Sequence, residues 1–294
     1  MTREAASAVE AAQTGVGPMA LVALEQRFAP RERIVTDDLA AALLPPTARA
    51  ALARMGPRAA SVMAAFAERR YPGLWGGMLC RKRFIDEKLR EALGAIEALV
   101  NLGAGFDTRA YRMLPGTGVR AWEVDQTSNI DAKWRRLSQR LGTLPPQIRL
   151  VAADLGRDAL DATLAAHGYV PQLRTFFIWE GVTQYLDEAG VRKTLAFLAT
   201  AAPGSRLAFT YVRRDFLEGA PMAGHAVYYH RFVEKRGIWR YGIDPAELPG
   251  LLASYGWRVI EAPEPQEMEQ RYIAPTGRTL TCMPIERSVY AERI

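Results

Sequence analysis

Short apolar segments alternate with helical patterns along the middle of this chain of 294 residues, and no other feature constrains the fold as strongly. The segments expected to form strands are 98–102, 119–125, 148–153, 175–179 and 206–212. Between them, apolar residues recur at intervals of four and three, as at Ile130, Trp134 and Leu137, which is the spacing of a helix face. Strands that alternate with helices build βαβ units. The sequence therefore predicts an α/β fold with a mostly parallel, doubly wound sheet.

The C-terminal region shows a different pattern. Residues 244–247 combine an N-cap aspartate, a proline at the first helical position and an acid at the third. They predict a helix that ends at Gly256. Segments 257–261 and 279–284 are expected to be strands joined by a polar loop. We therefore expect the sheet to close with an antiparallel hairpin.

Two other regions lack the alternation of strands and helices. Residues 1–94 show helical spacing and alanine-rich stretches but no convincing strand, so we expect an N-terminal helical cap. Residues 213–243 are rich in aromatic side chains and have no clear period, which is typical of an inserted substrate lid. The expected organisation is a cap over residues 1–94 and a core over residues 95–294 that carries the lid at about 213–243.

Composition and charge exclude several classes of protein. Lys and Arg total 38 against 32 Asp and Glu, a net charge of +6 with no long basic run, so we expect no nucleic-acid partner. Cys80 and Cys282 are too few for a disulfide framework or a cysteine-based zinc site, and we expect no metal. No apolar stretch reaches the roughly 18 residues of a membrane span, and no signal peptide is visible, so we expect a cytoplasmic protein without a membrane partner.

The sharpest local motif is the loop 101–107, which follows the first expected strand and opens a helix. Gly103 and Gly105 permit the positive φ and the close backbone approach that a bound ligand needs. The third glycine of a GxGxxG motif is missing, which favours a nucleoside with a small tail over a pyrophosphate. Asp125 follows Gly103 by 22 residues, near the spacing of about 20 expected for an acid that binds ribose hydroxyls. Asp125 could instead cap the next helix at Ser128.

Acidic side chains also follow the next two expected strands, at Asp154 and Glu180. In an open α/β sheet, ligands bind at the edge formed by the carboxyl ends of the strands. Asp154 could accept a hydrogen bond from an adenine amino group, and the Leu155 N–H could donate to a ring nitrogen. Together with the glycine loop, these acids predict a nucleoside site at that edge of the sheet.

Four motifs carry a resemblance to a known family. They are Asn-Leu-Gly-Ala-Gly-Phe-Asp-Thr-Arg at 101–109, Glu-Val-Asp at 123–125, Asp-Leu at 154–155 and Phe-Ile-Trp-Glu-Gly-Val-Thr-Gln-Tyr-Leu at 177–186. The chain resembles the leucine carboxyl methyltransferase family from about residue 14 to its C-terminus. That family also includes bacterial S-adenosylmethionine-dependent O-methyltransferases of natural-product pathways. The resemblance implies a class I methyltransferase fold and S-adenosylmethionine as the cofactor.

The resemblance also implies roles for single residues. The residues implied in cofactor binding are Arg81, Gly103, Gly105, Asp125, Asp154, Leu155 and Glu180. Arg81 is expected on the cofactor carboxylate, because a guanidinium can donate two parallel hydrogen bonds to a carboxylate, and Arg83 is the alternative. Residues 14–21 depart from the family pattern because they contain no basic residue, so we expect no second contact to the carboxylate there.

The methyl acceptor decides whether the reaction needs a base. A carboxylate, with a pKa near 4, is already ionised at neutral pH, whereas an alcohol or a phenol gains from a general base. The family resemblance and the scarcity of bases lead us to expect methyl ester formation on a small molecule. The residues expected near the acceptor are Tyr185, Arg213, Arg214, His225 and His230.

Other functions stay open from the sequence. Hydroxyl or nitrogen methylation of a natural-product scaffold would use His225 or His230 of the lid as a base. Methylation of a protein C-terminus is a further alternative, as is a protein that binds the cofactor without catalysis. The sequence does not decide the oligomeric state.

Overall fold

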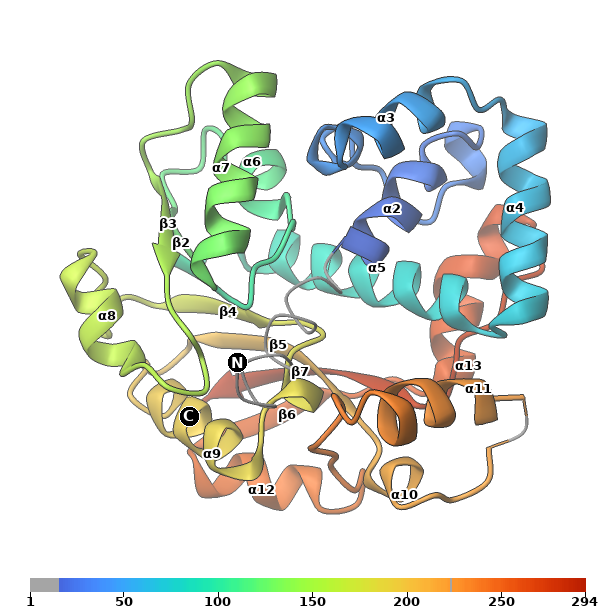
Figure 1. Ribbon diagram of the computed structural model, residues 1–294. Helices are drawn as coiled ribbons and strands as arrows, with labels where there is room; N and C mark the ends of the chain where they lie inside the picture. Colours follow the sequence, from blue (N-terminus) through green and yellow to red (C-terminus); the bar gives the residue numbers. More distant parts are fainter. Residues whose placement is uncertain (1–15, 223) are drawn as a thin grey trace.

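A single sheet forms the centre of the computed structural model, which describes residues 16–222 and 224–294. Within these residues the sheet has seven strands in the order β3-β2-β1-β4-β5-β7-β6 (Figure 1). The strands are β1 (Ala98–Leu102), β2 (Arg120–Asp125), β3 (Ile148–Ala152), β4 (Thr175–Trp179), β5 (Arg206–Val212), β6 (Trp257–Glu261) and β7 (Glu286–Arg293). Strands β1 to β5 are parallel, and β7 runs antiparallel to both β5 and β6. The predicted sheet is thus confirmed.

Helices cover both faces of the sheet (Figure 1). One layer contains α5 (Leu74–Ala92), α6 (Arg109–Met113) and α7 (Thr127–Leu141), and the other contains α8 (Leu160–Ala166), α9 (Glu188–Leu198) and α12 (Leu248–Ser254). Successive strand residues point to opposite faces, so Phe176 and Ile178 pack in the first core while Phe177 and Trp179 pack in the second. Because helices cover both faces of the sheet there, the central strands β1 and β4 are buried at every position rather than at alternate positions.

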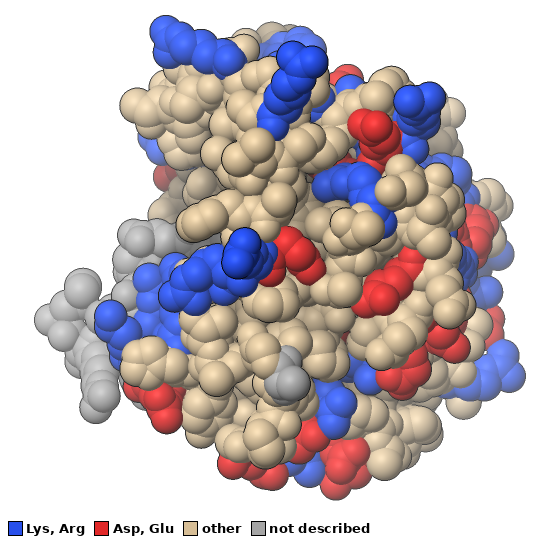
Figure 2. All heavy atoms as spheres, turned by 90° about the vertical axis from the view of Figure 1, so that its right-hand side faces the viewer, with Lys and Arg blue, Asp and Glu red and all other residues tan. Residues whose placement is uncertain are grey.

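The N-terminal region is helical as far as it is described. Helices α2 (Val16–Glu25), α3 (Pro46–Ala53) and α4 (Pro57–Arg70) lie beside α5, joined by 3₁₀ turns at Pro30–Glu32 and Ala40–Leu43. Helix α4 forms an outer edge of the molecule and exposes Val62, Met63 and Phe66. Figure 2 views this side directly, and uncharged side chains predominate in the upper half of that face.

One strand predicted in the C-terminal region is wrong. The second strand of the hairpin is β7, not residues 279–284. Residues 281–283 instead pack against the start of α5, where the Met283 N–H donates to the Gly73 carbonyl at 3.0 Å. Helix α12 follows a turn in which Asp244 makes the contacts predicted for an N-cap, since its carboxylate accepts from the Ala246 N–H at 2.9 Å and its carbonyl accepts from the Leu248 N–H at 3.2 Å.

The segment between β5 and α12 leaves and rejoins the sheet at one point, because Arg213 forms a β-bridge with Ile243. It contains α10 (Arg214–Leu217), α11 (Ala226–Tyr228) and a π-helix at Tyr229–Lys235. Its apolar side chains form a small core of their own with Val212, Met283 and Ile285. In the described part of the chain, no helix is both long and apolar enough to cross a membrane.

The contact between α5 and residues 281–283 leaves no space for a side chain at Gly76. A Cβ there would lie 2.2 Å from the Thr281 carbonyl oxygen and 3.0 Å from Ile273 Cδ1. We expect Gly76→Ala to lower the free energy of unfolding by about 1–3 kcal/mol despite the better helix propensity of alanine. Urea unfolding measures this. Gly94→Ala is the control, since nothing lies within 4 Å of its added Cβ, and an equal effect of both changes would contradict the prediction.

Candidate functional site

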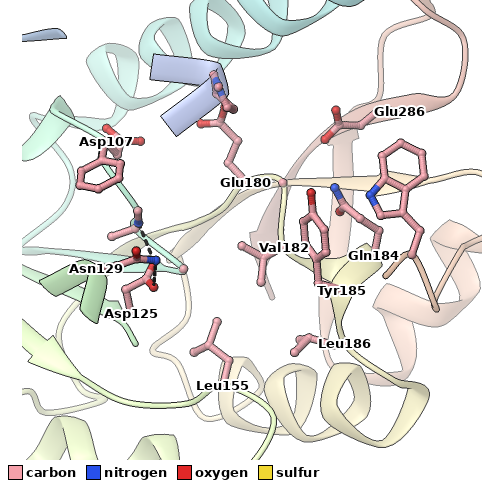
Figure 3. Close-up of a pocket in the computed structure, with 18 of the residues that line it drawn as sticks. Asp107, Asp125, Asn129, Leu155, Glu180, Val182, Gln184, Tyr185, Leu186 and Glu286 are labelled. Carbon is pink, nitrogen blue, oxygen red and sulfur yellow. Dashed lines mark hydrogen bonds between the residues drawn. The ribbon is translucent and has the colours of Figure 1, made fainter. Parts of the chain in front are cut away.

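A cavity of about 880 Å³ opens at the carboxyl ends of the parallel strands. It lies where the order of the strands reverses, between β1 and β4, which is the position at which open α/β sheets bind ligands. Figure 3 shows Asp107, Asp125 and Asn129 on one side of it, and Gln184 and Tyr185 on the other. The cavity therefore joins the glycine loop to the region around the 213–243 segment.

The glycine loop lies at one wall of the cavity. Gly103 and Gly105 have φ values of +72° and +44°, in the left-handed region that favours glycine. A Cβ on Gly103 would lie 2.3 Å from Val182 Cγ2, so the loop after β1 and the loop after β4 are in close contact. The Gly105 N–H donates to Asp125 Oδ2 at 2.6 Å, which ties the loop to the end of β2.

Asp125 is held by three donors. Besides Gly105, the Gln126 N–H and the Asn129 amide donate to Oδ1 at 2.7 and 2.8 Å. Asp125 is 8% exposed and lines the cavity together with Asn129. Asn129 was not predicted from the sequence, although it lies in the first turn of α7, directly after the strand that ends at Asp125.

The next two expected cofactor residues lie at the end of β3. Asp154 and Leu155 both line the cavity. Asp154 Oδ1 accepts from the Gly156 N–H at 2.9 Å, while the Leu155 side chain is buried. The structure thus brings together the glycine loop and the residues that follow β2 and β3.

Glu180, after β4, is surrounded by cations. Arg81 Nε and Arg109 Nη1 each lie 2.7 Å from its carboxylate, and Lys82 Nζ lies at 3.4 Å. Burial by itself would raise the pKa of Glu180, but these three cations outweigh burial and hold that pKa well below its usual value. Arg109 also pairs with Asp86 and Asp107, so the charges form one buried network.

Arg81 pairs with a second acid that the sequence analysis missed. Its Nη1 lies 2.8 and 2.6 Å from the two carboxylate oxygens of Glu286, the first residue of β7. The two residues are 205 positions apart, and only the pairing of β7 with β5 brings them together. Both line the cavity, whereas Arg83, the alternative to Arg81, is not among its lining residues.

Of the five residues expected near the acceptor, only Tyr185 lines the cavity. The other four are not among its lining residues, and each has contacts with other side chains. Arg213 pairs with Asp215, and Arg214 pairs with Glu247. His230 is exposed and contacts Glu234, while His225 stacks on Tyr228 with 5.8 Å between ring centroids.

The 213–243 segment does reach the cavity, but through other side chains. These are Tyr228, Arg231, Phe232, Arg236, Trp239 and Arg240. The rings of Phe232 and Trp239 stack with centroids 4.7 Å apart and planes at 9°. The Arg240 N–H donates to the Gln184 carbonyl at 2.7 Å, which joins the segment to the loop after β4. No periodic pattern marks these residues, so the sequence offered no signal for them.

The buried charge network makes stability depend on pH. Because the pKa of Glu180 is lowered in the folded state, its contribution is fully present above about pH 4.3, the ordinary value for glutamate. That contribution is lost as the pH falls towards the lowered value. We expect Glu180→Gln to lower the free energy of unfolding at pH 7 by about 3 kcal/mol, because it removes the negative charge that Arg81, Arg109 and Lys82 share. The gap to the wild type should narrow as the pH falls from 5 to 3.

Urea unfolding at a series of pH values measures that gap. Glu188→Gln is a suitable control, since Glu188 pairs with Arg192 on the exposed side of α9. The control should follow the wild type at every pH. A gap for Glu180→Gln that stays constant with pH would show that ionisation of this carboxylate is not what stabilises the fold.

Comparison with known proteins agrees with this geometry. The family model described as leucine carboxyl methyltransferase matches residues 15–199. A protein of Mycolicibacterium smegmatis, provisionally named an S-adenosyl-L-methionine-dependent methyltransferase, is 36% identical over 209 residues, which cover 69% of this chain and 66% of that relative. A protein of Streptomyces avermitilis with the same provisional name is 31% identical over 212 residues, which cover 68% of this chain and 75% of the relative.

Solved structures show the same fold at low sequence identity. A provisionally named methyltransferase from Thermobifida fusca has a TM-score of 0.57 at 16% identity, over 80% of this chain and 88% of that one. A DUF574 family protein from Streptomyces avermitilis has a TM-score of 0.52 at 16% identity, over 80% and 91%. The sheet is that of a class I methyltransferase. The chain therefore belongs to the leucine carboxyl methyltransferase family and is an S-adenosylmethionine-dependent methyltransferase.

Proposed function

We propose that this enzyme methylates the carboxylate of a small-molecule metabolite and releases a methyl ester. One observation carries the proposal, namely the lining of the cavity beside the 213–243 segment. Arg231, Arg236 and Arg240 line it there, and the lining contains no histidine among the described residues. Cationic side chains suit an anionic acceptor, and a carboxylate that is already ionised at neutral pH needs no base.

The residues around the glycine loop fit the cofactor. Asp125 and Asp154 are hydrogen-bond acceptors beside the buried apolar side chain of Leu155, which suits a nucleoside. We propose that Asp125 holds the ribose, that Asp154 and Leu155 hold the adenine, and that Gly103 and Gly105 lie against the methionine part. Arg81 and Glu180 lie at the same cavity and complete the proposed set. When bound, the cofactor supplies a methyl group activated by its sulfonium.

The work of the protein is then to orient the acceptor. Methyl transfer is an in-line displacement, so an enzyme that holds the acceptor in line with the methyl group of the cofactor gains much of its rate enhancement from orientation. The stacked pair of Phe232 and Trp239 offers an apolar wall, and the arginines of the same segment offer positive charge. Tyr185 and Gln184 line the same cavity as Glu180 (Figure 3), where they can position the acceptor.

We further propose that the division inferred from the sequence serves this cavity. Residues of α2, including Met19 and Leu21, line it, which supports a role of the N-terminal helices as a cap. The lining residues of the 213–243 segment support its role as a lid that keeps water from the reacting groups. Hydroxyl or nitrogen methylation with His225 or His230 as the base is less favoured, because neither side chain lines the cavity.

The proposal is tested by the chemistry of the product. The enzyme is incubated with radiolabelled S-adenosylmethionine and a small-molecule extract, and labelled products are identified by mass spectrometry. We expect a product that loses its label in mild alkali, because methyl esters hydrolyse there. Labelled products that all withstand alkali would point to an ether or an amine and overturn the proposal.

The role of the lid arginines is tested by kinetics. We expect Arg231→Met and Arg236→Met each to raise the KM for the acceptor about fivefold, since a solvent-screened ion pair contributes up to about 1 kcal/mol. The kcat and the affinity for the cofactor should change little. Arg213→Met is the matched control, because Arg213 pairs with Asp215 away from the cavity. An equal KM for all three variants and the wild type would exclude these arginines from acceptor binding.

A further inference from the structure

We infer that Glu286 accepts the ammonium group at the amino-acid end of the cofactor, next to Arg81, which the family resemblance places on the carboxylate. The inference does not depend on the identity of the methyl acceptor. It rests on the geometry of the two side chains, both of which line the cavity and are each only 9% exposed. Figure 3 shows Glu286 on the same cavity as Glu180.

Arg81 has one nitrogen left for a ligand. Its Nε donates to Glu180 at 2.7 Å, and its Nη1 donates to both oxygens of Glu286. The remaining nitrogen, Nη2, has no hydrogen-bond partner among the described residues and lies beside Gly181, 3.4 Å from where a Cβ would stand. A guanidinium that is fixed on two sides and open on the third is well placed to bind an anionic group.

The Glu286 carboxylate can also accept a further hydrogen bond. Its Oε1 accepts from Arg81 and from the Thr210 hydroxyl at 2.7 Å, whereas its Oε2 accepts from Arg81 alone. The Thr210 hydroxyl accepts from the Gly181 N–H at 2.8 Å, so its own proton is directed at Glu286. An ionised carboxylate can accept about four hydrogen bonds. Glu286 is therefore held in place while one oxygen can take a further donor.

Glu180 is a poorer partner for the ammonium group. Three cations already surround its two oxygens, and Arg109 is shared with Asp86 and Asp107 in the buried network. Glu286, by contrast, meets a single cation, Arg81. An α-amino acid carries its ammonium and carboxylate groups on the same carbon atom, which matches a carboxylate and a guanidinium in contact. A ligand with only one charge would leave one side of the Arg81–Glu286 pair unmatched.

Binding measurements with three probes test the inference without turnover. The probes are S-adenosylhomocysteine, its analogue without the amino group, and 5′-methylthioadenosine, which lacks the whole amino-acid end. By calorimetry, wild-type enzyme should bind S-adenosylhomocysteine at least about tenfold more tightly than the deaminated analogue, as expected for a hydrogen bond between charged groups. Glu286→Gln should remove that difference and leave the affinity for the other two probes unchanged.

Glu292→Gln is the matched control, since Glu292 lies on the same strand but pairs with Arg206 and Arg258 outside the cavity. It should bind all three probes as the wild type does. Equal wild-type affinity for S-adenosylhomocysteine and its deaminated analogue would overturn the inference without any variant, even if Glu286→Gln does not fold. An equal loss of affinity for both probes in Glu286→Gln would also overturn it, because Glu286 would then only position Arg81.

Discussion

The buried charge network around Glu180 is the interaction on which the site depends. Its members come from α5, from the start of α6 and from the end of β4, and through Arg81 it extends to β7. A buried charge without a partner destabilises the fold. These elements must therefore pack in the arrangement that brings the opposite charges into contact. The network therefore sets the position of α5 against the carboxyl edge of the sheet, and with it one wall of the cavity.

The two sides of the cavity arise from different parts of the architecture. Parallel strands bring the loops after β1, β2 and β3 to one edge, so the nucleoside side follows from the sheet itself. The side beside Tyr185 is built from a segment that leaves the sheet at Arg213 and returns at Ile243. The side proposed for the cofactor is thus built by the sheet, and the side proposed for the acceptor is built by an insertion. The proposed carboxylate acceptor follows from the second side alone.

Sequence reasoning worked where local pattern and local structure coincide. The strand β4 was predicted to the residue. It failed at 279–284, where an extended apolar segment packs on α5 instead of pairing in the sheet. The expectation for His225 and His230 rested only on their position in the chain, and neither is among the residues that line the cavity, because the direction of a side chain depends on the packing around it.

The sequence by itself determined the α/β class, the family and the acids at the ends of β2, β3 and β4. These depend on periodicity and on motifs a few residues long, which a chain carries before it folds. Only the tertiary structure decided that Arg81 meets Glu286, and that Arg231, Phe232 and Trp239, rather than the histidines, line the cavity. Those contacts join residues far apart in the chain or depend on which face of an irregular segment is buried. These contacts follow from the packing of the whole molecule and leave no local pattern in the sequence.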